Sequence, residues 1–278
     1  MNSSKRPLHI ACLQARPRPD FQSALDEIIA LAEEAVEKGA EFITTPEYCG
    51  GLKTEGSAFV PPSAPEESHP VLIGLRNFAK NWKKYLLIGS VAINGPENKI
   101  LNRSFIIDDE GNVISRYDKI HLFDISLSER ESYCESASVH GGKKAVICQT
   151  PFGCMGQTIC YDVRFPHLYR DLSQSGADIL FVPAAFTQKT GKAHWHVLNR
   201  ARAIENGAFV VAPCAIGKID GGGASYGHSL IINPWGEVLA DGRDQAGVIS
   251  AVIDLEEVLT ARGRIPSLSH DRSFDMVE

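Results

Sequence analysis

The sequence predicts an α/β protein in which strands alternate with helices. Short apolar segments recur along the chain, and amphipathic segments with a helical period separate many of them. Gly- and Pro-containing turns mark the boundaries between the two kinds of segment. Because helices that alternate with strands cover the faces of sheets, we expect helix-covered sheets, and hairpins among the strands indicate that these sheets are mixed.

The first half of the chain begins with an alternating strand and a helix that Asp20 can cap. Two segments rich in turn-forming or polar residues, 49–67 and 120–143, are expected to be long loops, and long ordered loops often form the walls of active sites. The expected strands are 7–14, 42–45, 85–93, 99–108 and one that ends at Lys119, and the expected helices are 20–38 and 69–84.

The second half continues the alternation and ends in an irregular tail, residues 263–278. Its helix after residue 193 is expected to end at Gly207, since glycine is the usual residue after a helix terminus. The expected strands are 144–150, 154–160, 178–183, 209–215, 229–233 and 247–253, and the expected helices are 166–175, 193–206 and 255–262.

No linker, repeat or low-complexity segment divides the 278 residues, so a single domain over residues 1–278, with a core from about 7 to 255, is the simplest interpretation. The net charge of −6 and the lack of a long basic run argue against nucleic-acid binding. No apolar stretch approaches the ~20 residues that a membrane-spanning helix needs, and no signal peptide is evident. Seven irregularly spaced cysteines indicate reduced thiols and a cytoplasmic location.

Three reactive side chains follow expected strands: Glu47, Lys119 and Cys160. The crevice beyond the carboxyl ends of strands is where open α/β sheets bind ligands. Brought together there, a carboxylate, an ammonium and a thiol would supply a base, a cation and a nucleophile. Each residue alone has an ordinary interpretation, as a solvated carboxylate, a surface lysine or a buried core cysteine.

Four motifs of the chain resemble the nitrilase superfamily of carbon–nitrogen hydrolases, over a region from Ile10 to about Leu255. The motifs are Pro-Glu at Glu47, Asp-Lys-Ile-His-Leu-Phe-Asp at Lys119, Ile-Cys-Tyr-Asp-Val-Arg-Phe-Pro at Cys160, and residues 183–195. The resemblance implies a four-layer α-β-β-α sandwich and a cysteine-dependent amidase that hydrolyses a small carboxamide through a thioester. It also implies at least a homodimer paired through the helices near Tyr169 and Arg202. No cofactor or metal is expected, because the seven Cys and nine His show no ligand spacing of a zinc or iron site.

The resemblance assigns a role to each residue of the site. Cys160 is the nucleophile, Glu47 the general base, and Lys119 the cation that faces the developing oxyanion. The backbone N–H of Tyr161 is the expected second oxyanion donor. Glu135 matches a second glutamate that orients the lysine and the substrate, although Glu129 and Glu131 lie in the same acidic loop.

Alternatives remain within and outside this family. Nitrilases usually have Trp-Glu after the cysteine, where this chain has Tyr161-Asp162, and carbamoyl hydrolases show other residues there. A non-catalytic interaction protein would usually have lost a member of the triad, and no papain-type cysteine motif occurs. The segment 224–239 resembles the amidase branches that act on deaminated glutathione and on 2-oxo acid amides, which leaves the physiological substrate open.

Several polar residues near these motifs are expected to have structural roles. Asp162 and Arg164 are expected to form an ion pair that holds the turn after the nucleophile. His194 and His196 are two apart on an expected helix, so they should face different directions and not share a metal ion. His196 also replaces the glutamate that is usual in the family.

Overall fold

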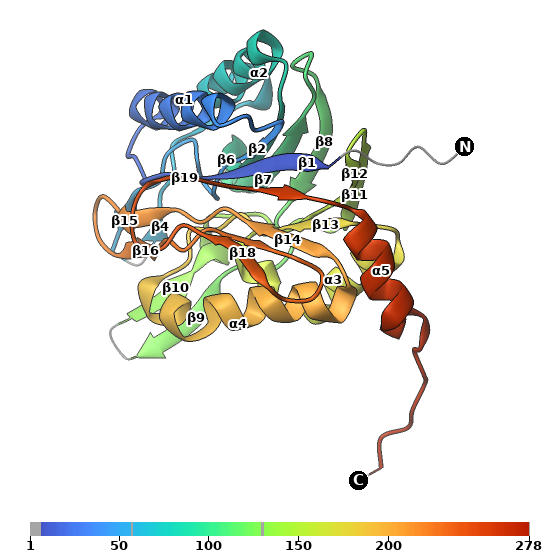
Figure 1. The fold of residues 1–278 in the computed structure, drawn as a ribbon. Helices are drawn as coiled ribbons and strands as arrows, with labels where there is room; N and C mark the ends of the chain where they lie inside the picture. The colour runs from blue at the N-terminus through green and yellow to red at the C-terminus, as the bar shows by residue number, and fades with distance from the viewer. Residues whose placement is uncertain (1–6, 57, 129–130, 278) are drawn as a thin grey trace.

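The computed structural model describes residues 7–56, 58–128 and 131–277. Two β-sheets stack face to face, with helices α1 and α2 outside one sheet and α3 and α4 outside the other (Figure 1). The layers therefore follow the order α-β-β-α, which confirms the predicted four-layer sandwich.

The first sheet has seven strands and is mixed. β1 pairs in parallel with β2, β2 pairs in parallel with β6, and the late strand β19 returns to pair antiparallel with β1. Its strand order is β19-β1-β2-β6-β7-β8, with β5 beside β6. The strands are β1 (Leu8–Gln14), β2 (Phe42–Thr44), β5 (Ser63–Ala64), β6 (Tyr85–Asn94), β7 (Ile100–Ile107), β8 (Val113–Asp118) and β19 (Gly247–Ile253).

The second sheet has six strands in the order β11-β12-β13-β14-β17-β18, and it is also mixed. Three two-stranded ribbons lie outside the main sheets. The strands of the second sheet are β11 (Val146–Thr150), β12 (Gly153–Gln157), β13 (Ile179–Phe181), β14 (Phe209–Ala212), β17 (Leu230–Ile232) and β18 (Val238–Asp241). The ribbons are β3 (Thr54–Glu55) with β4 (Ala58–Phe59), β9 (Asp124–Ser128) with β10 (Glu131–Cys134), and β15 (Ile216–Lys218) with β16 (Ala224–Tyr226).

Two helix ends follow the predicted caps. Asp20 accepts a hydrogen bond from the N–H of Ser23 at 2.9 Å and caps α1, and Gly207 ends α4 with a left-handed φ of 51°. The helices are α1 (Phe21–Glu37), α2 (Pro70–Trp82), α3 (Pro166–Gln174), α4 (Gln188–Asn206) and α5 (Glu256–Arg264). Short 3₁₀ turns are η1 (Glu66–Ser68), η2 (Pro96–Asn98), η3 (Glu135–Ala137), η4 (Cys160–Arg164) and η5 (Ser267–Ser269).

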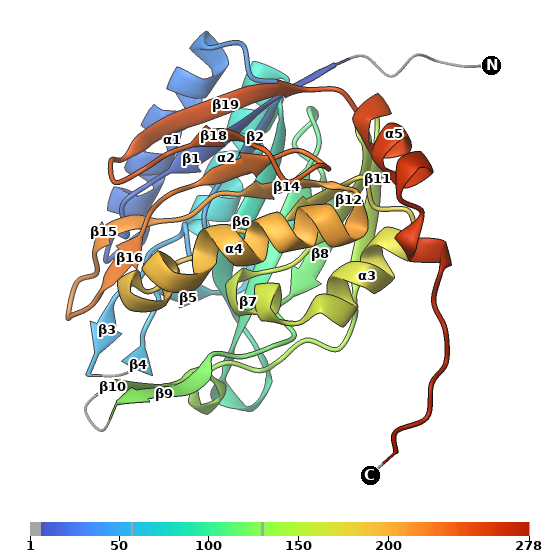
Figure 2. The ribbon, with the colours of Figure 1, turned by 60° about the horizontal axis from the view of Figure 1, so that its bottom comes forward.

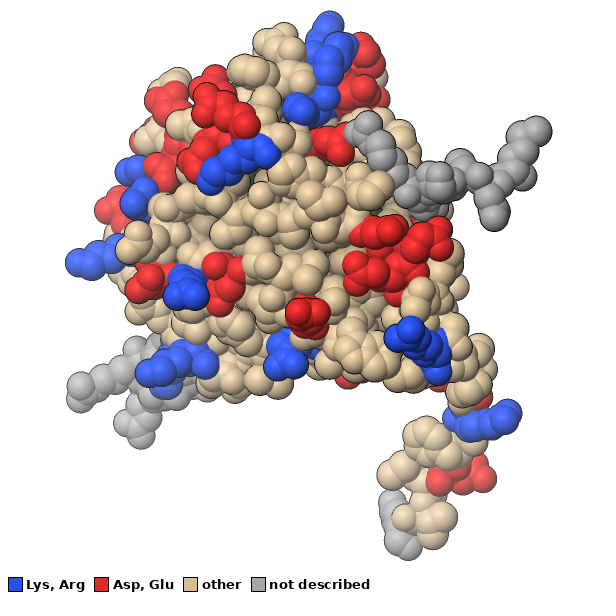
Figure 3. All heavy atoms as spheres, in the orientation of Figure 1, with Lys and Arg blue, Asp and Glu red and all other residues tan. Residues whose placement is uncertain are grey.

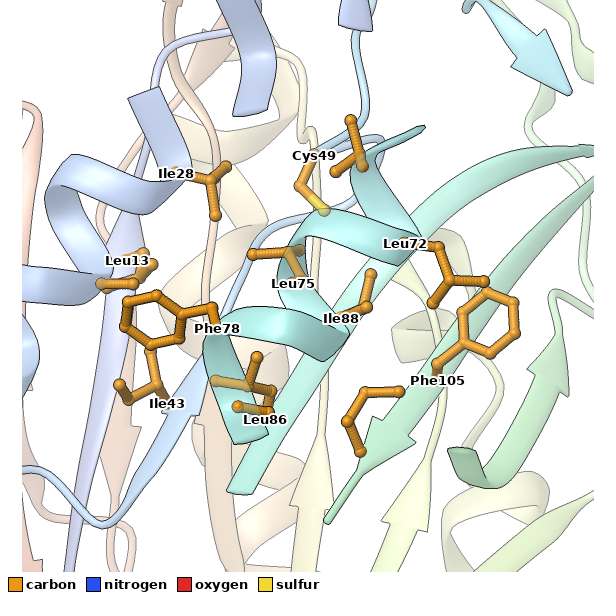
Figure 4. Close-up of a cluster of buried hydrophobic side chains, with 14 of the residues drawn as sticks. Leu13, Ile28, Ile43, Cys49, Leu72, Leu75, Phe78, Leu86, Ile88 and Phe105 are labelled. Carbon is orange, nitrogen blue, oxygen red and sulfur yellow. The ribbon is translucent and has the colours of Figure 1, made fainter. Parts of the chain in front are cut away.

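Three apolar layers hold the sandwich together. Between the sheets, Phe42 packs on Phe181 with ring centroids 5.5 Å apart. Outside the first sheet, Ile28, Leu75 and Phe78 of α1 and α2 pack on strand residues such as Ile43, Leu86 and Ile88 (Figure 4). Outside the second sheet, α3 and α4 cover a matching layer that includes Leu172, Leu180, Trp195 and Val210.

The structure differs from the prediction mainly in irregular regions. The two expected loops contain the ribbons β3–β4 and β9–β10, whose short strands carry little periodicity to detect. Strand β12 ends at Gln157, and residues 158–159 lead into the 3₁₀ turn η4, which begins at Cys160. Helix α4 starts at Gln188 rather than residue 193, because Gly191 obscures the helical pattern; a Cβ there would lie 2.4 Å from the ring of Tyr226. The prediction also missed β15, β16 and β18.

On the face in Figure 3, an uncharged band lies over β19 and β18, acidic and basic side chains lie to its left, and a compact acidic cluster lies to its right over α5. Within the described residues, no helix is long and apolar enough to cross a membrane.

We predict that Phe181→Ala lowers the free energy of unfolding by about 3–5 kcal/mol, because the ring is fully buried between the sheets and the neighbouring side chains cannot refill its volume. The same change at Phe274, which is 82% exposed, should stay within about 0.5 kcal/mol. Urea denaturation of both variants measures the two values, and equal losses would contradict this account of the core.

Candidate active site

The expected site residues lie around one pocket at the edge of the sandwich. Glu47, Lys119, Glu135 and Cys160 line it together with apolar walls that include Phe59, Phe123 and Phe186. Glu47 follows β2, Lys119 follows β8, and Cys160 opens the turn after β12. Figure 2 shows the ribbons β3–β4 and β9–β10 gathered at the same end of the molecule as the first turn of α4.

Both expected wall loops contribute to the pocket. Phe59 comes from the first loop, and Phe123 and Glu135 come from the second. The ring of Phe59 stacks on Tyr133 at a centroid distance of 5.6 Å, so the two ribbons support each other. Of the acidic residues in the second loop, Glu135 occupies the site, whereas Glu129 lies outside the described residues.

Glu47 is fixed by backbone contacts on both sides. The N–H of Ala185 donates to its Oε2 at 2.9 Å, and the N–H of the next residue, Tyr48, donates to Oγ of Ser90 at 2.8 Å. Strand β6 passes so close to this segment that a Cβ on Gly89 would lie 2.1 Å from the carbonyl oxygen of Thr45. Glycine is therefore required at this position for Glu47 to reach the pocket.

Lys119 lies between two carboxylates and is almost completely buried, with 2% of its side chain exposed. Its Nζ is 2.9 Å from Oε1 of Glu47 and 2.8 Å from Oε2 of Glu135. Burial alone would lower the pKa of Lys119, but the negative charges of Glu135 and Glu47 outweigh it and hold the pKa well above its usual value. The side chain is therefore an ammonium ion.

Cys160 opens the turn η4 in a left-handed conformation, with φ 49°, and its N–H donates to the carbonyl oxygen of Pro183 at 2.9 Å. Burial and the negative charge of Glu47 raise the pKa of the thiol well above its usual value, although Lys119 acts in the opposite sense. A helical turn of five residues adds little against burial and a neighbouring carboxylate.

The expected ion pair between Asp162 and Arg164 is wrong. Asp162 is fully buried and accepts hydrogen bonds from the hydroxyl of Tyr117 at 2.7 Å and from the N–H groups of His121 and Ile159. It therefore secures the turn after Cys160 to the strand that ends at Lys119. The guanidinium of Arg164 instead lies 3.3 Å from Nδ1 of His194 and beside two pocket walls, 5.8 Å from the ring centroid of Tyr161 and 5.4 Å from that of Phe186.

Two site residues were missed from the sequence. Asn102 on β7 donates from Nδ2 to Glu47 at 2.9 Å and to Glu135 at 3.3 Å, and the hydroxyl of Tyr48 donates to Glu135 at 3.3 Å. A polar residue inside an apolar strand was the available signal for Asn102. Tyr48 is adjacent to Glu47, but its left-handed φ of 52° turns it in a direction that the sequence does not indicate.

His194 and His196 face different neighbours, as expected. His194 contacts Arg164, whereas Nε2 of His196 lies 3.2 Å from Oδ2 of Asp241.

Comparison with known proteins agrees with this architecture. Residues 9–262 match the family model described as carbon–nitrogen hydrolase. A deaminated glutathione amidase from Synechocystis is 39% identical over 269 residues, which cover 95% of this chain and 98% of that protein. Omega-amidase NIT2 from Xenopus tropicalis is 34% identical over 267 residues, which cover 96% and 95%.

A solved structure shares the whole sandwich. The crystal structure of Saccharomyces cerevisiae Nit3, described as a member of branch 10 of the nitrilase superfamily, aligns with a TM-score of 0.84 at 27% identity and covers 97% of each chain. With the motifs around Glu47, Lys119 and Cys160 embedded in this fold, and with a family match over most of its length, the chain belongs to the carbon–nitrogen hydrolase family.

Proposed function

We propose that this hydrolase cleaves the C–N bond of a small carboxamide through a covalent thioester on Cys160. The observation that carries the proposal is the buried Glu47–Lys119–Glu135 cluster, which lines one pocket together with the Cys160 thiol. Such a pocket offers a nucleophile, a base and a fixed cation to the same bound group.

In the acylation step, Sγ of Cys160 attacks the amide carbon while Glu47 takes the thiol proton. A base is needed because the thiol, with its raised pKa, is neutral at neutral pH. The carbonyl oxygen becomes an oxyanion that faces the ammonium of Lys119 and the N–H of Tyr161. The first N–H groups of a helical turn have no acceptor within the turn, so the N–H of Tyr161 can donate to the oxyanion. Glu47 then protonates the amine, the C–N bond breaks, and the acyl group stays on sulfur.

In the deacylation step, Glu47 is again a carboxylate and takes a proton from water as the water oxygen attacks the thioester carbon. The second tetrahedral intermediate uses the same oxyanion donors. The C–S bond then breaks, and the sulfur recovers its proton from Glu47. Glu135 positions Lys119 in both steps, because it contacts Nζ with both carboxylate oxygens. This chemistry needs no metal or cofactor.

The substrate that we propose carries a carboxylate at the end remote from its amide. The similarity to proteins named deaminated glutathione amidase and omega-amidase supports this substrate class. Arg164 is the proposed partner of that carboxylate, since its guanidinium lies beside the pocket walls Tyr161 and Phe186. Arginine suits the task because its planar fork matches a carboxylate.

Other activities in the same fold fit the site less well. A nitrile presents nitrogen where Lys119 and the N–H of Tyr161 would stabilise an oxyanion, and a carbamoyl hydrolase would act on a ureido carbon. A purely interacting protein would have no need for the buried cluster, which is costly to desolvate.

We also propose that the chain forms one catalytic domain and assembles at least into a homodimer. The helices near Tyr169 and Arg202 are the proposed contact surface. Tyr169 and Arg202 themselves are buried within the chain, with Arg202 over the ring of Tyr169, so the exposed Val197 and Ile204 of α4 would supply apolar contact area. Light scattering at micromolar concentration tests the assembly, and an active monomer would refute it.

The cysteine thiols and the thiol nucleophile support a cytoplasmic location.

We predict that Cys160→Ala abolishes amide turnover and leaves the fold intact, because the change removes only the attacking sulfur. Intact-protein mass spectrometry of the wild type with a slow amide should show an acyl adduct that the variant lacks. Cys148→Ala provides the control and should affect stability more than turnover. Amidase activity that persists in folded Cys160→Ala would refute the thioester.

Glu47→Gln should lower the rate of amide turnover but raise the fraction of Cys160 that is thiolate at a given pH. Turnover should fall by about 10²–10⁴-fold, because the general base is lost. Alkylation of Cys160 by iodoacetamide should shift to lower pH, because removal of the negative charge that raises the thiol pKa favours the thiolate. The rate of alkylation against pH measures this shift, and a shift to higher pH would show that Glu47 does not act on the thiol.

Among succinamate, butanamide and the cyano acid of the same carbon skeleton, succinamate should have the highest kcat/KM, by at least about tenfold, or about 1.4 kcal/mol. Arg164→Gln should remove this preference by raising KM for succinamate, with the values for butanamide unchanged. A nitrile that is hydrolysed faster than both amides would contradict the amidase, and an unchanged preference in Arg164→Gln would contradict the role of the arginine.

A further inference from the structure

Three potential metal ligands converge at a site separate from the catalytic pocket. His196 comes from α4, His228 from the segment before β17, and Asp241 from the end of β18. Nε2 of His196 lies 3.2 Å from Oδ2 of Asp241, and Nδ1 of His228 lies 3.0 Å from Oδ1 of Asp241. Within the described parts of the chain, these residues form the single group of three His, Cys, Asp or Glu side chains close enough to hold an ion.

The spacing of these atoms fits one tetrahedral ion. Zinc binds imidazole nitrogen and carboxylate oxygen at about 2.0–2.2 Å, so two ligands of a tetrahedral zinc ion lie about 3.3 Å apart. Both histidines lie at about this separation from the same carboxylate oxygen, because Oδ2 of Asp241 is 3.2 Å from Nε2 of His196 and 3.3 Å from Nδ1 of His228. One ligand atom from each of the three residues lies within 4.8 Å of the other two.

The surroundings hold two of the ligands in place. The ring of Tyr226 stacks on His228 at a centroid distance of 4.5 Å, and the N–H of Arg243 donates to Oδ1 of Asp241 at 2.8 Å. The three side chains are 24–34% exposed, so an ion can reach them from solvent.

We propose that His196, His228 and Asp241 bind one divalent transition ion of the Zn²⁺ class, with water in the remaining coordination position. Two imidazoles and one carboxylate are a common ligand set for such ions. None of the three residues lines the catalytic pocket, so the ion has no part in the hydrolysis. It would join α4, β18 and the segment before β17 by one coordination centre.

This site gives the replacement of glutamate by His196 a physical role, and it differs from one expectation from the sequence. His196 was not expected to bind a metal, because its neighbour His194 faces away. Its partners His228 and Asp241 lie 32 and 45 positions further along the chain, so no short ligand spacing in the sequence indicates the site. The competing arrangement has no ion, and Asp241 simply accepts hydrogen bonds from both histidines.

Calorimetric titration of the chelator-treated, full-length protein with zinc chloride distinguishes the two arrangements. The titration uses the Cys160→Ala background, so that the active-site thiol cannot bind the zinc. We expect one zinc ion per chain and an increase in Tm on binding. His196→Gln should weaken binding by at least about tenfold and remove the Tm shift, as should Asp241→Asn. His194→Gln, two residues away on the same helix, is the matched control and should bind zinc as the parent does.

Three results would overturn the proposal: no zinc binding by the parent, unchanged binding by folded His196→Gln, or equal losses in His196→Gln and His194→Gln. Substitution with Co²⁺ adds a spectroscopic criterion. A tetrahedral cobalt spectrum without thiolate charge-transfer bands supports the nitrogen and oxygen ligands, and strong thiolate bands would assign the ion to a cysteine instead. Urea denaturation without zinc confirms that each variant is folded.

Discussion

The site depends on one buried ammonium held between two carboxylates. Lys119, Glu47 and Glu135 are each less than 5% exposed, and removal of one partner from such a buried pair typically costs about 3–5 kcal/mol. Charges this deep are tolerated because each has partners: Asn102 bridges the two glutamates, and the N–H groups of Ala185 and Phe123 each donate to one of them. The rest of the fold must be complete before these partners meet.

The stacking of the two sheets explains how segments that are far apart in the sequence place these residues side by side. Glu47 and Lys119 follow strands of the first sheet, while Cys160 and Ala185 follow strands of the second. Face-to-face stacking brings the ends of both sheets to the same edge. Asp162 then links the two halves directly, since it secures the turn after Cys160 to Tyr117 on β8. The apolar layer between the sheets, with Phe42 against Phe181, fixes the distance across which these contacts form.

How much of this could be predicted from the sequence differs between segments. Strands such as β1 and β6 and helices such as α1 carry strong periodicity and clear caps, so their positions followed from local chemistry. The resemblance to a family was needed to predict that Glu47, Lys119, Glu135 and Cys160 lie around one site. The contacts between them join distant positions, since Lys119 is 72 positions from Glu47 and 16 positions from Glu135 in the sequence. Asn102, Tyr48 and the real partners of Asp162 and Arg164 depend on tertiary contacts and backbone turns that one sequence does not specify.

The charge of the site is consistent with the neutral thiol of the proposed mechanism. Two carboxylates and one ammonium leave a net negative charge beside Cys160, which disfavours a third anion on the sulfur. In the proposed mechanism, Glu47 loses its negative charge when it takes the thiol proton, while the oxyanion forms on the substrate. The net charge of the pocket stays the same, and negative charge moves from Glu47 to the substrate oxygen. Lys119 contacts Glu47 before this transfer and lies within the same pocket as the new anion, so one ammonium can balance both states without a large rearrangement.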